Sequence, residues 1–168
     1  EFPFPPPQSV IDAAKTEAGK LQLYSDPECT QFIEKAAQVW KVKKTQILAT
    51  NGSDEILNFA FMTFCGDGRE VYFPDITYGF YKVFADLYDI KYNAIPLEDD
   101  FTINSEKYYN AKRMVVIANP NAPTGICLPL ETIEEVVKNN PDNVVLIDEA
   151  YVDFGGESAY KLVDKYDN

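Results

Sequence analysis

The sequence contains no histidine, and this absence excludes several kinds of active site. Ser-His-Asp triads and Cys-His dyads need an imidazole as the general base, and many zinc sites need one as a ligand. Cysteine is also scarce: Cys29, Cys65 and Cys127 are widely spaced and form no C-x-x-C pair. Such cysteines are typical of core-filling thiols in a reducing compartment. We therefore expect a cytoplasmic protein with no metal site.

Positive charge is the second shortage. The chain has 15 basic against 27 acidic residues, a net charge of −12, and its only arginines are Arg69 and Arg113. A surface this negative repels phosphate backbones and anionic lipid heads, so we expect no nucleic-acid or membrane partner. An anionic small ligand stays possible because a local site can oppose the overall field. Long apolar runs are missing too, and no signal peptide or transmembrane segment is expected.

What is present indicates an ordinary globular protein, with 46% hydrophobic and 25% charged residues among 168. The chain opens at Glu1 with the proline-rich run E-F-P-F-P-P-P, which predicts an extended arm and is consistent with an internal segment of a longer protein or with processing. A first helix is predicted with Ser9 as its N-cap, running from Val10 towards Gly19. A second is predicted from about Pro27 to Trp40.

Beyond these helices, strand and helix patterns alternate. Alternation at this spacing predicts an α/β three-layer sandwich around a mostly parallel sheet. Helices are predicted over 53–65, 78–88 and 130–138, and strands over 47–49, 71–73, 92–95, 114–118 and 144–147. Because ligands collect at the carboxyl ends of parallel strands, we expect the polar segments that follow three of these strands to converge, namely 51–54, 119–125 and 148–151.

Two of these segments have residues suited to binding charged groups. The segment 50–55 (T-N-G-S-D-E) joins a strand to a helix N-terminus, where free amides and the helix dipole suit a phosphate; the alternative is that its residues are simply good first-turn residues. It is neither a Walker loop nor a G-x-G-x-x-G motif. Asp148 and Glu149 end an apolar strand, where an acid needs a positive partner such as a protonated pyridine nitrogen. From spacing alone, a strand end in water or a magnesium ligand is the better explanation of these two acids.

Two further features suggest a rigid site for a flat ligand. The segment 119–125 (N-P-N-A-P-T-G) places two prolines and a glycine directly after a buried strand, which predicts a rigid positioning loop. Tyr78, at the start of a predicted helix, can offer a stacking face to a flat cofactor. With 11 tyrosines and 11 phenylalanines in the chain, a core or surface role is the simpler explanation for any one of them.

Taken in this order, N-G-S-D-E, I-T-Y-G-F-Y, N-P-N-A-P-T-G and D-E-A-Y-V-D-F resemble the fold-type-I aminotransferases, and most of all the histidinol-phosphate aminotransferase family. The resemblance covers essentially the whole chain. It implies a pyridoxal 5′-phosphate cofactor and a homodimer that transfers an amino group between a small-molecule donor and a 2-oxo acid in histidine biosynthesis. Residues 1–26 would be the arm and first helix, and 27–168 part of the cofactor-binding large domain.

The resemblance also implies a role for each site residue. Backbone amides of Gly52, Ser53 and Asp54 would hold the cofactor phosphate. Tyr78 would stack on the ring, Asp148 would face its nitrogen, and Tyr151 would donate to its phenolic oxygen. Tyr24 would reach the phosphate in the partner subunit.

The chain departs from the family pattern at two places. The family usually has asparagine directly before Pro-Thr-Gly, where this chain, like some relatives, has Ala122, so Asn121 is the reserve candidate for contacting the cofactor. The Schiff-base lysine lies about thirty residues after the ring-nitrogen aspartate in this family, beyond Asn168, so we expect no turnover from this chain alone. Two alternatives stay open: a related decarboxylase such as the threonine-phosphate decarboxylases, or a non-catalytic binding module.

Overall fold

The computed structural model describes residues 3–65 and 70–168. The sequence Gly66-Asp67-Gly68, which predicts a turn, and Arg69 lie outside the described residues. The chain divides into two compact units, Glu1–Ala49 and Thr50–Asn168. The division predicted after residue 26 does not coincide with this boundary and stays a prediction.

The first unit is helical. It contains α1 (Gln8–Ala18), α2 (Thr30–Trp40) and the short 3-10 helix η1 (Lys44–Gln46). The predicted N-cap at Ser9 is wrong, because Pro7 occupies the cap position and its carbonyl accepts the first helical hydrogen bonds. The second helix begins three residues after Pro27, because the Asp26 carboxylate caps the turn before it by accepting from the amides of Glu28 and Thr30.

One predicted strand is missing from this first unit. Ile47 has an extended backbone, but residues 47–49 pair with no neighbouring strand among the residues that the structure describes. A strand needs a partner for its backbone groups, and an apolar triplet does not specify one. The strand prediction for 47–49 is therefore wrong for this chain.

The second unit is built on a parallel sheet with the strand order β2-β1-β3-β4. The strands are β1 (Glu70–Pro74), β2 (Lys91–Ile95), β3 (Met114–Ala118) and β4 (Val145–Asp148). The α-helices are α3 (Gly52–Cys65), α4 (Phe80–Leu87) and α5 (Leu130–Lys138), and the 3-10 helices are η2 (Ser105–Tyr108), η3 (Val152–Phe154) and η4 (Ala159–Leu162). Each of these strands and α-helices was predicted, with ends that differ by two residues at most.

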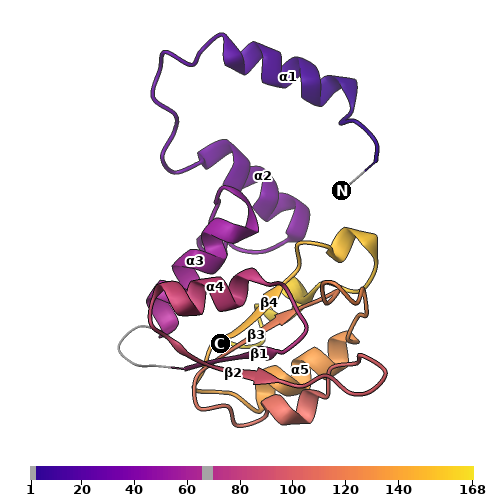
Figure 1. Cartoon of the computed structure of the whole chain (residues 1–168). Coiled ribbons are helices and arrows are strands. Elements are labelled where there is room, and N and C mark those ends of the chain that lie inside the picture. Colours follow the sequence, from indigo (N-terminus) through magenta and orange to yellow (C-terminus); the bar gives the residue numbers. More distant parts are fainter. Residues whose placement is uncertain (1–2, 66–69) are drawn as a thin grey trace. The chain divides into compact units, whose positions relative to one another are not determined.

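The alternation of side chains along β3 creates the three layers. All five of its residues are buried. Val116 and Ala118 pack in the cluster that contains Leu57 and Phe61 of α3 and Tyr81 of α4. On the opposite face Val115 and Ile117 pack with Val136 of α5. Figure 1 shows α3 and α4 on one side of the sheet and α5 on the other, so the predicted α/β sandwich is confirmed.

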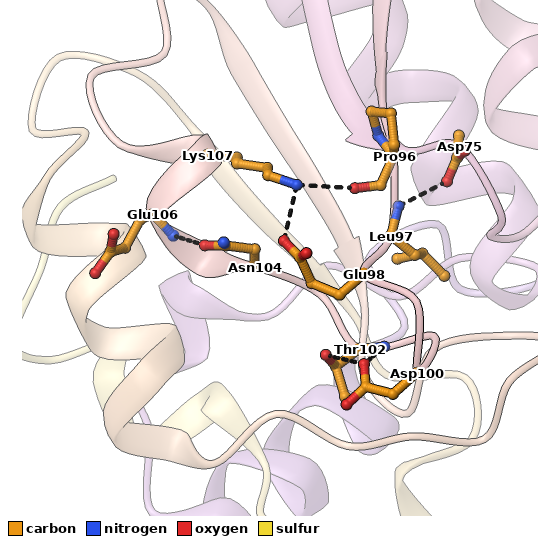
Figure 2. Close-up of polar contacts among 9 residues, drawn as sticks. All are labelled: Asp75, Pro96, Leu97, Glu98, Asp100, Thr102, Asn104, Glu106 and Lys107. Atoms are coloured by element: carbon orange, nitrogen blue, oxygen red, sulfur yellow. Dashed lines mark hydrogen bonds and ion pairs between the residues drawn. The ribbon is translucent and has the colours of Figure 1, made fainter.

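An acidic loop, residues 96–104, connects the carboxyl end of β2 to η2, and Figure 2 shows its polar contacts. The Asp75 carboxylate accepts from the amide of Leu97 at 3.0 Å, which ties the end of β1 to the end of β2. Lys107 pairs with Glu98 at 2.8 Å, and this contact lowers the pKa of Glu98. Asp100 accepts from both the amide and the hydroxyl of Thr102. These acids stabilise the loop, and no group of three or more metal-binding side chains occurs in the described part of the chain.

β4 is the last strand of the sheet in the described residues. It pairs with β3 alone, and all four of its residues are half-buried. On its outer side the amide of Val145 donates to the carbonyl of Asn168 at 2.9 Å. None of the helices in residues 3–65 and 70–168 is long and apolar enough to span a bilayer.

Candidate functional site

A cavity of about 280 Å³ lies at the carboxyl ends of β3 and β4, near the lower limit of small-molecule sites, which hold roughly 300–1,000 Å³. All three polar segments predicted to converge contribute to its walls. The lining residues are Asn51, Gly52, Ser53, Asp54, Tyr78, Ala118, Pro120, Ala122, Asp148, Ala150 and Tyr151.

One end of the cavity is the N-terminus of α3. Gly52 has a φ of +76°, a left-handed conformation that favours glycine and allows the backbone to turn sharply into the helix. The first N–H groups of a helix have no partner within it, and the helix dipole makes this end electropositive. The amide of Gly52 already donates to the carbonyl of Thr50 at 3.0 Å, and the amides of Ser53 and Asp54 follow it in the first turn. Glu55 accepts from the amide of Asn51 at 2.6 Å, and Asp54, which also lines the cavity, accepts from Tyr78. This end of the cavity therefore suits an anionic group.

Tyr78 forms an aromatic part of the wall. Its hydroxyl donates to Asp54 at 2.8 Å, and its ring stacks on Phe80 with centroids 5.8 Å apart and planes at 17°. Partial burial, the hydrogen bond to Asp54 and the negative charges nearby raise the pKa of Tyr78 to about 12. The phenol is therefore neutral and held in place beside the cavity at neutral pH.

Asp148 lies at the far end of β4 and faces the same cavity. Its Oδ2 accepts from the hydroxyl of Tyr81 at 2.7 Å, and its Oδ1 accepts from the amide of Ala150 at 3.1 Å. Burial of the phenol, together with the charge of Asp148, raises the pKa of Tyr81 far above its ordinary value. Sequence reasoning missed Tyr81, although its position three residues after Tyr78 was a signal that the two rings would lie together.

Glu149, the second acid of the pair, has a different role. Its carboxylate points away from the cavity lining and accepts from the hydroxyl of Ser158 and, at 2.6 Å, from the amide of Ala159. These bonds cap the turn before η4. Only Asp148 of the two acids is therefore available to a ligand in this cavity.

The loop after β3 presents Ala122 to the cavity rather than Asn121. Asn121 is buried, and both ends of its side-chain amide are hydrogen-bonded. The side-chain nitrogen donates to the carbonyl of Ile76, and the side-chain oxygen accepts from the hydroxyl of Thr77 at 2.8 Å. The side chain predicted as a reserve contact thus braces the loop against the segment that carries Tyr78.

The two remaining candidates lie in different parts of the chain. Tyr151 lines the cavity and is half exposed. Tyr24 belongs to the first compact unit and its side chain is fully exposed. Of the predicted site residues, Gly52, Ser53, Asp54, Tyr78, Asp148 and Tyr151 are brought together around one cavity.

The polar and aromatic groups that line this cavity are complementary to pyridoxal 5′-phosphate. Amides at a helix N-terminus suit its phosphate, and the Asp148 carboxylate suits a protonated ring nitrogen. The Tyr78 ring offers an apolar face between these two ends. The residues present therefore fit the group.

The chain matches the family model "Aminotransferase class I and II" over residues 1–168. The histidinol-phosphate aminotransferase of Brachyspira hyodysenteriae is 47% identical over the whole of this chain and 48% of its own length. The crystal structure of histidinol-phosphate aminotransferase from Sinorhizobium meliloti in complex with pyridoxal-5′-phosphate shares the fold at 24% identity. Its TM-score is 0.77, with 87% of this chain and 41% of that chain covered.

The same fold occurs in the L-threonine-O-3-phosphate decarboxylase of Porphyromonas gingivalis, at 23% identity and a TM-score of 0.70 over 82% of this chain and 41% of that one. The chain spans about half the length of the curated relatives it matches. Because the family model matches every residue, this chain belongs to the class I and II aminotransferases, which depend on pyridoxal 5′-phosphate.

Proposed function

We propose that the intact protein is a cytoplasmic histidinol-phosphate aminotransferase of histidine biosynthesis, and that residues 50–168 form one wall of its cofactor site. The single observation that carries this proposal is the cavity that joins the N-terminus of α3 to the carboxylate of Asp148. The identity of 47% to a curated relative with this name supports the choice of substrate.

In this proposal each end of the cavity performs one task. The amides of Gly52, Ser53 and Asp54 bind the cofactor phosphate, and Tyr78 orients the ring by stacking on it. Pyridoxal 5′-phosphate, when bound, supplies an electron-withdrawing ring that carries the amino group between substrates. Asp148 holds a proton at the ring nitrogen, and Tyr151 donates to the phenolic oxygen. Asn121 keeps the intervening loop in place.

We also propose a homodimer in which Tyr24 of one subunit contacts the phosphate bound by the other. This contact would join the helical first unit to the function of the second. The Tyr24 ring is exposed, and Ala36 is the one buried side chain among residues 3–49, which supports the idea that a further surface covers this unit.

A phosphothreonine decarboxylase is the second candidate, because a decarboxylase of that substrate shares the fold. Both reactions need the same cofactor site, so the cavity does not distinguish them. The intact protein distinguishes them directly: incubation with histidinol phosphate and 2-oxoglutarate yields glutamate in one case, and phosphothreonine releases carbon dioxide in the other.

The test of the cofactor site is a fluorescence and absorbance titration of the 168-residue chain. We expect saturable but weak binding of pyridoxal 5′-phosphate, and about tenfold weaker binding of pyridoxal, because pyridoxal lacks the group that the helix N-terminus binds. Inorganic phosphate should compete with the cofactor. Equal binding of pyridoxal and pyridoxal 5′-phosphate would contradict the phosphate assignment, and sustained amino transfer by this chain alone would contradict the proposal that its chemistry needs a lysine outside it.

A further inference from the structure

Tyr81 is a fully buried tyrosine whose hydroxyl is directed at the functional end of the sheet. Its side chain has no measurable exposure, and its hydroxyl donates to Oδ2 of Asp148 at 2.7 Å across 67 residues of sequence. The hydrogen bond therefore connects α4, on one face of the sheet, with the last residue of β4. No role in the proposed cofactor contacts uses this residue.

The Tyr81 ring is held on several sides. Its centroid lies 6.5 Å from that of Phe61, 5.9 Å from that of Phe73 and 5.6 Å from that of Tyr78, with the Tyr78 ring edge-on at 79°. Close packing of this kind leaves a side chain one low-energy rotamer. The position of the hydroxyl is therefore fixed by the core and does not depend on a ligand.

The carboxylate of Asp148 is consequently fixed at both oxygens. Tyr81 donates to one oxygen and the amide of Ala150 donates to the other. The main-chain bond alone leaves the carboxylate free to rotate about its last torsion, which is broad for aspartate. The tyrosine removes that freedom.

We propose that Tyr81 is a positioning residue that holds the Asp148 carboxylate in line with the ring nitrogen of the bound cofactor. This inference rests on the proposed function, because it assumes that Asp148 meets such a nitrogen. Tyr81 touches neither cofactor nor substrate in this role and acts through Asp148. Tyr78, just before α4, and Tyr81, within α4, thus have different roles. Tyr78 orients the cofactor ring by stacking on its face, and Tyr81 orients the Asp148 carboxylate that contacts the ring nitrogen.

A second buried tyrosine shows that the hydrogen bond is not required by burial alone. Tyr108 is 1% exposed, and its hydroxyl has no hydrogen-bond partner in the described residues. It lies in the cluster on the other face of the sheet, with Val136 of α5. The fold therefore accommodates an unpartnered phenol, and Tyr108 provides a matched control for removing a hydroxyl from the core.

The experiment compares Tyr81→Phe with Tyr108→Phe in the 168-residue chain. The probe is pyridoxamine 5′-phosphate labelled at its ring nitrogen, and the NMR shift of that nitrogen is followed in the complex as the pH is raised. In Tyr81→Phe we expect the pH at which the bound ring loses its proton to fall by about one unit, since a carboxylate that rotates out of line stabilises the cation less. Affinity should fall about tenfold. Tyr108→Phe should leave both quantities unchanged.

Two further variants separate the possible failures. Asp148→Asn tests the acid itself, and the double variant Tyr81→Phe with Asp148→Asn tests whether the tyrosine acts through it. If it does, the double variant should lose no more affinity than Asp148→Asn alone, because effects in one network are not additive. Thermal unfolding of each variant confirms that the comparison is made on folded protein.

The outcomes are distinct. If Asp148→Asn lowers affinity while Tyr81→Phe behaves like Tyr108→Phe, the positioning role is wrong and the proposed function stands. A raised deprotonation pH in Tyr81→Phe also overturns the positioning role, because the tyrosine would then be weakening the charge of Asp148. If neither Asp148→Asn nor Tyr81→Phe changes binding, or the wild-type chain shows no saturable binding, the proposed function fails and the positioning role fails with it.

Discussion

The two ends of the parallel sheet are both rich in polar side chains, yet they differ in what those side chains face. At the carboxyl end, Asp148 and the N-terminus of α3 border a cavity. At the amino end, asparagines that precede β4 bond to the main chain instead. Asn140 is 1% exposed; its oxygen accepts from the amide of Ala111, and its nitrogen donates to the carbonyls of Tyr108 and Val136.

The difference teaches how to separate structural from functional polarity in this fold. Asn143 and Asn168 extend the amino-end cluster, and Asn143 donates to the carbonyl of Ala111 at 2.6 Å. These hydrogen bonds hold the loops that precede β3 and β4 in place, and they satisfy buried backbone groups. At the carboxyl end, polar groups are oriented by neighbours but still border open space. A buried polar cluster indicates a ligand site only where such space exists.

Replacing Asn140 should have the largest effect on stability. Asn140→Ala removes three hydrogen bonds and leaves one buried amide and two carbonyls without their partner, so we expect a loss of about 3–5 kcal/mol in the free energy of unfolding. Urea unfolding followed by circular dichroism measures this loss. Asn139→Ala is the control: its side chain makes one bond, to the carbonyl of Glu135, and should cost about 1 kcal/mol or less. Equal losses would show that the amino-end cluster has no special role.

At the carboxyl end, substitutions of Asp148 should affect stability and cofactor binding differently. Asp148→Ala leaves the buried hydroxyl of Tyr81 without its acceptor, and we expect unfolding free energy to fall by about 1–3 kcal/mol. Asp148→Asn keeps an acceptor and should be more stable than Asp148→Ala. Both variants lose the charge, so both should bind pyridoxal 5′-phosphate about tenfold more weakly in a fluorescence titration. Wild-type affinity in Asp148→Asn would contradict the role of the negative charge.

The titration of Tyr78 gives a smaller, pH-dependent effect. Its pKa is raised from 10.0 in the reference phenol to about 12. Between these values the unfolded chain releases this proton while the native chain keeps it, so unfolding becomes easier as the pH rises through this window. Tyr78→Phe should therefore lose less stability than the wild type between pH 10 and 12. The difference in phenolate absorbance between the two proteins measures the titration, and Asp54→Asn should lower its midpoint.

Glu149 should give the smallest effect on binding, although it adjoins Asp148 in the sequence. Glu149→Gln keeps an acceptor for the amide of Ala159 and should cost about 1 kcal/mol of stability. Cofactor affinity should change by about twofold or less, because a charged side chain that does not touch the ligand contributes little binding energy. A tenfold loss of affinity would show that Glu149, and not the cap it forms, takes part in binding.

Much of the second unit could be predicted from residue patterns. β3 and α5 have the predicted boundaries, because an unbroken apolar run ending before Asn119-Pro120 and an amphipathic helix after Pro129 are both local signals. The segment 47–49 carries a similar apolar signal, but a strand exists only with a partner. Pairing depends on residues far away in the sequence, and local patterns do not contain it.

The candidate site was predictable in its positions but less so in its contacts. The strand-end rule and the family resemblance located the α3 N-terminus and Asp148 around one cavity. Neither gave the hydrogen bond between Tyr81 and Asp148, which spans 67 residues, nor the separation of Asp148 from Glu149. Asn121 was proposed as a reserve contact because of its position in the loop, and its use as a brace depends on Ile76 and Thr77.

The outer side of β4 affects how this protein should be handled. Apart from the bond between Val145 and Asn168, the described residues place no second strand there. An open strand edge is a template for pairing with a further strand, so we expect association of this chain to increase with its concentration. Binding measurements on the cavity are therefore best made in dilute solution, where association is slowest and the chain is monomeric.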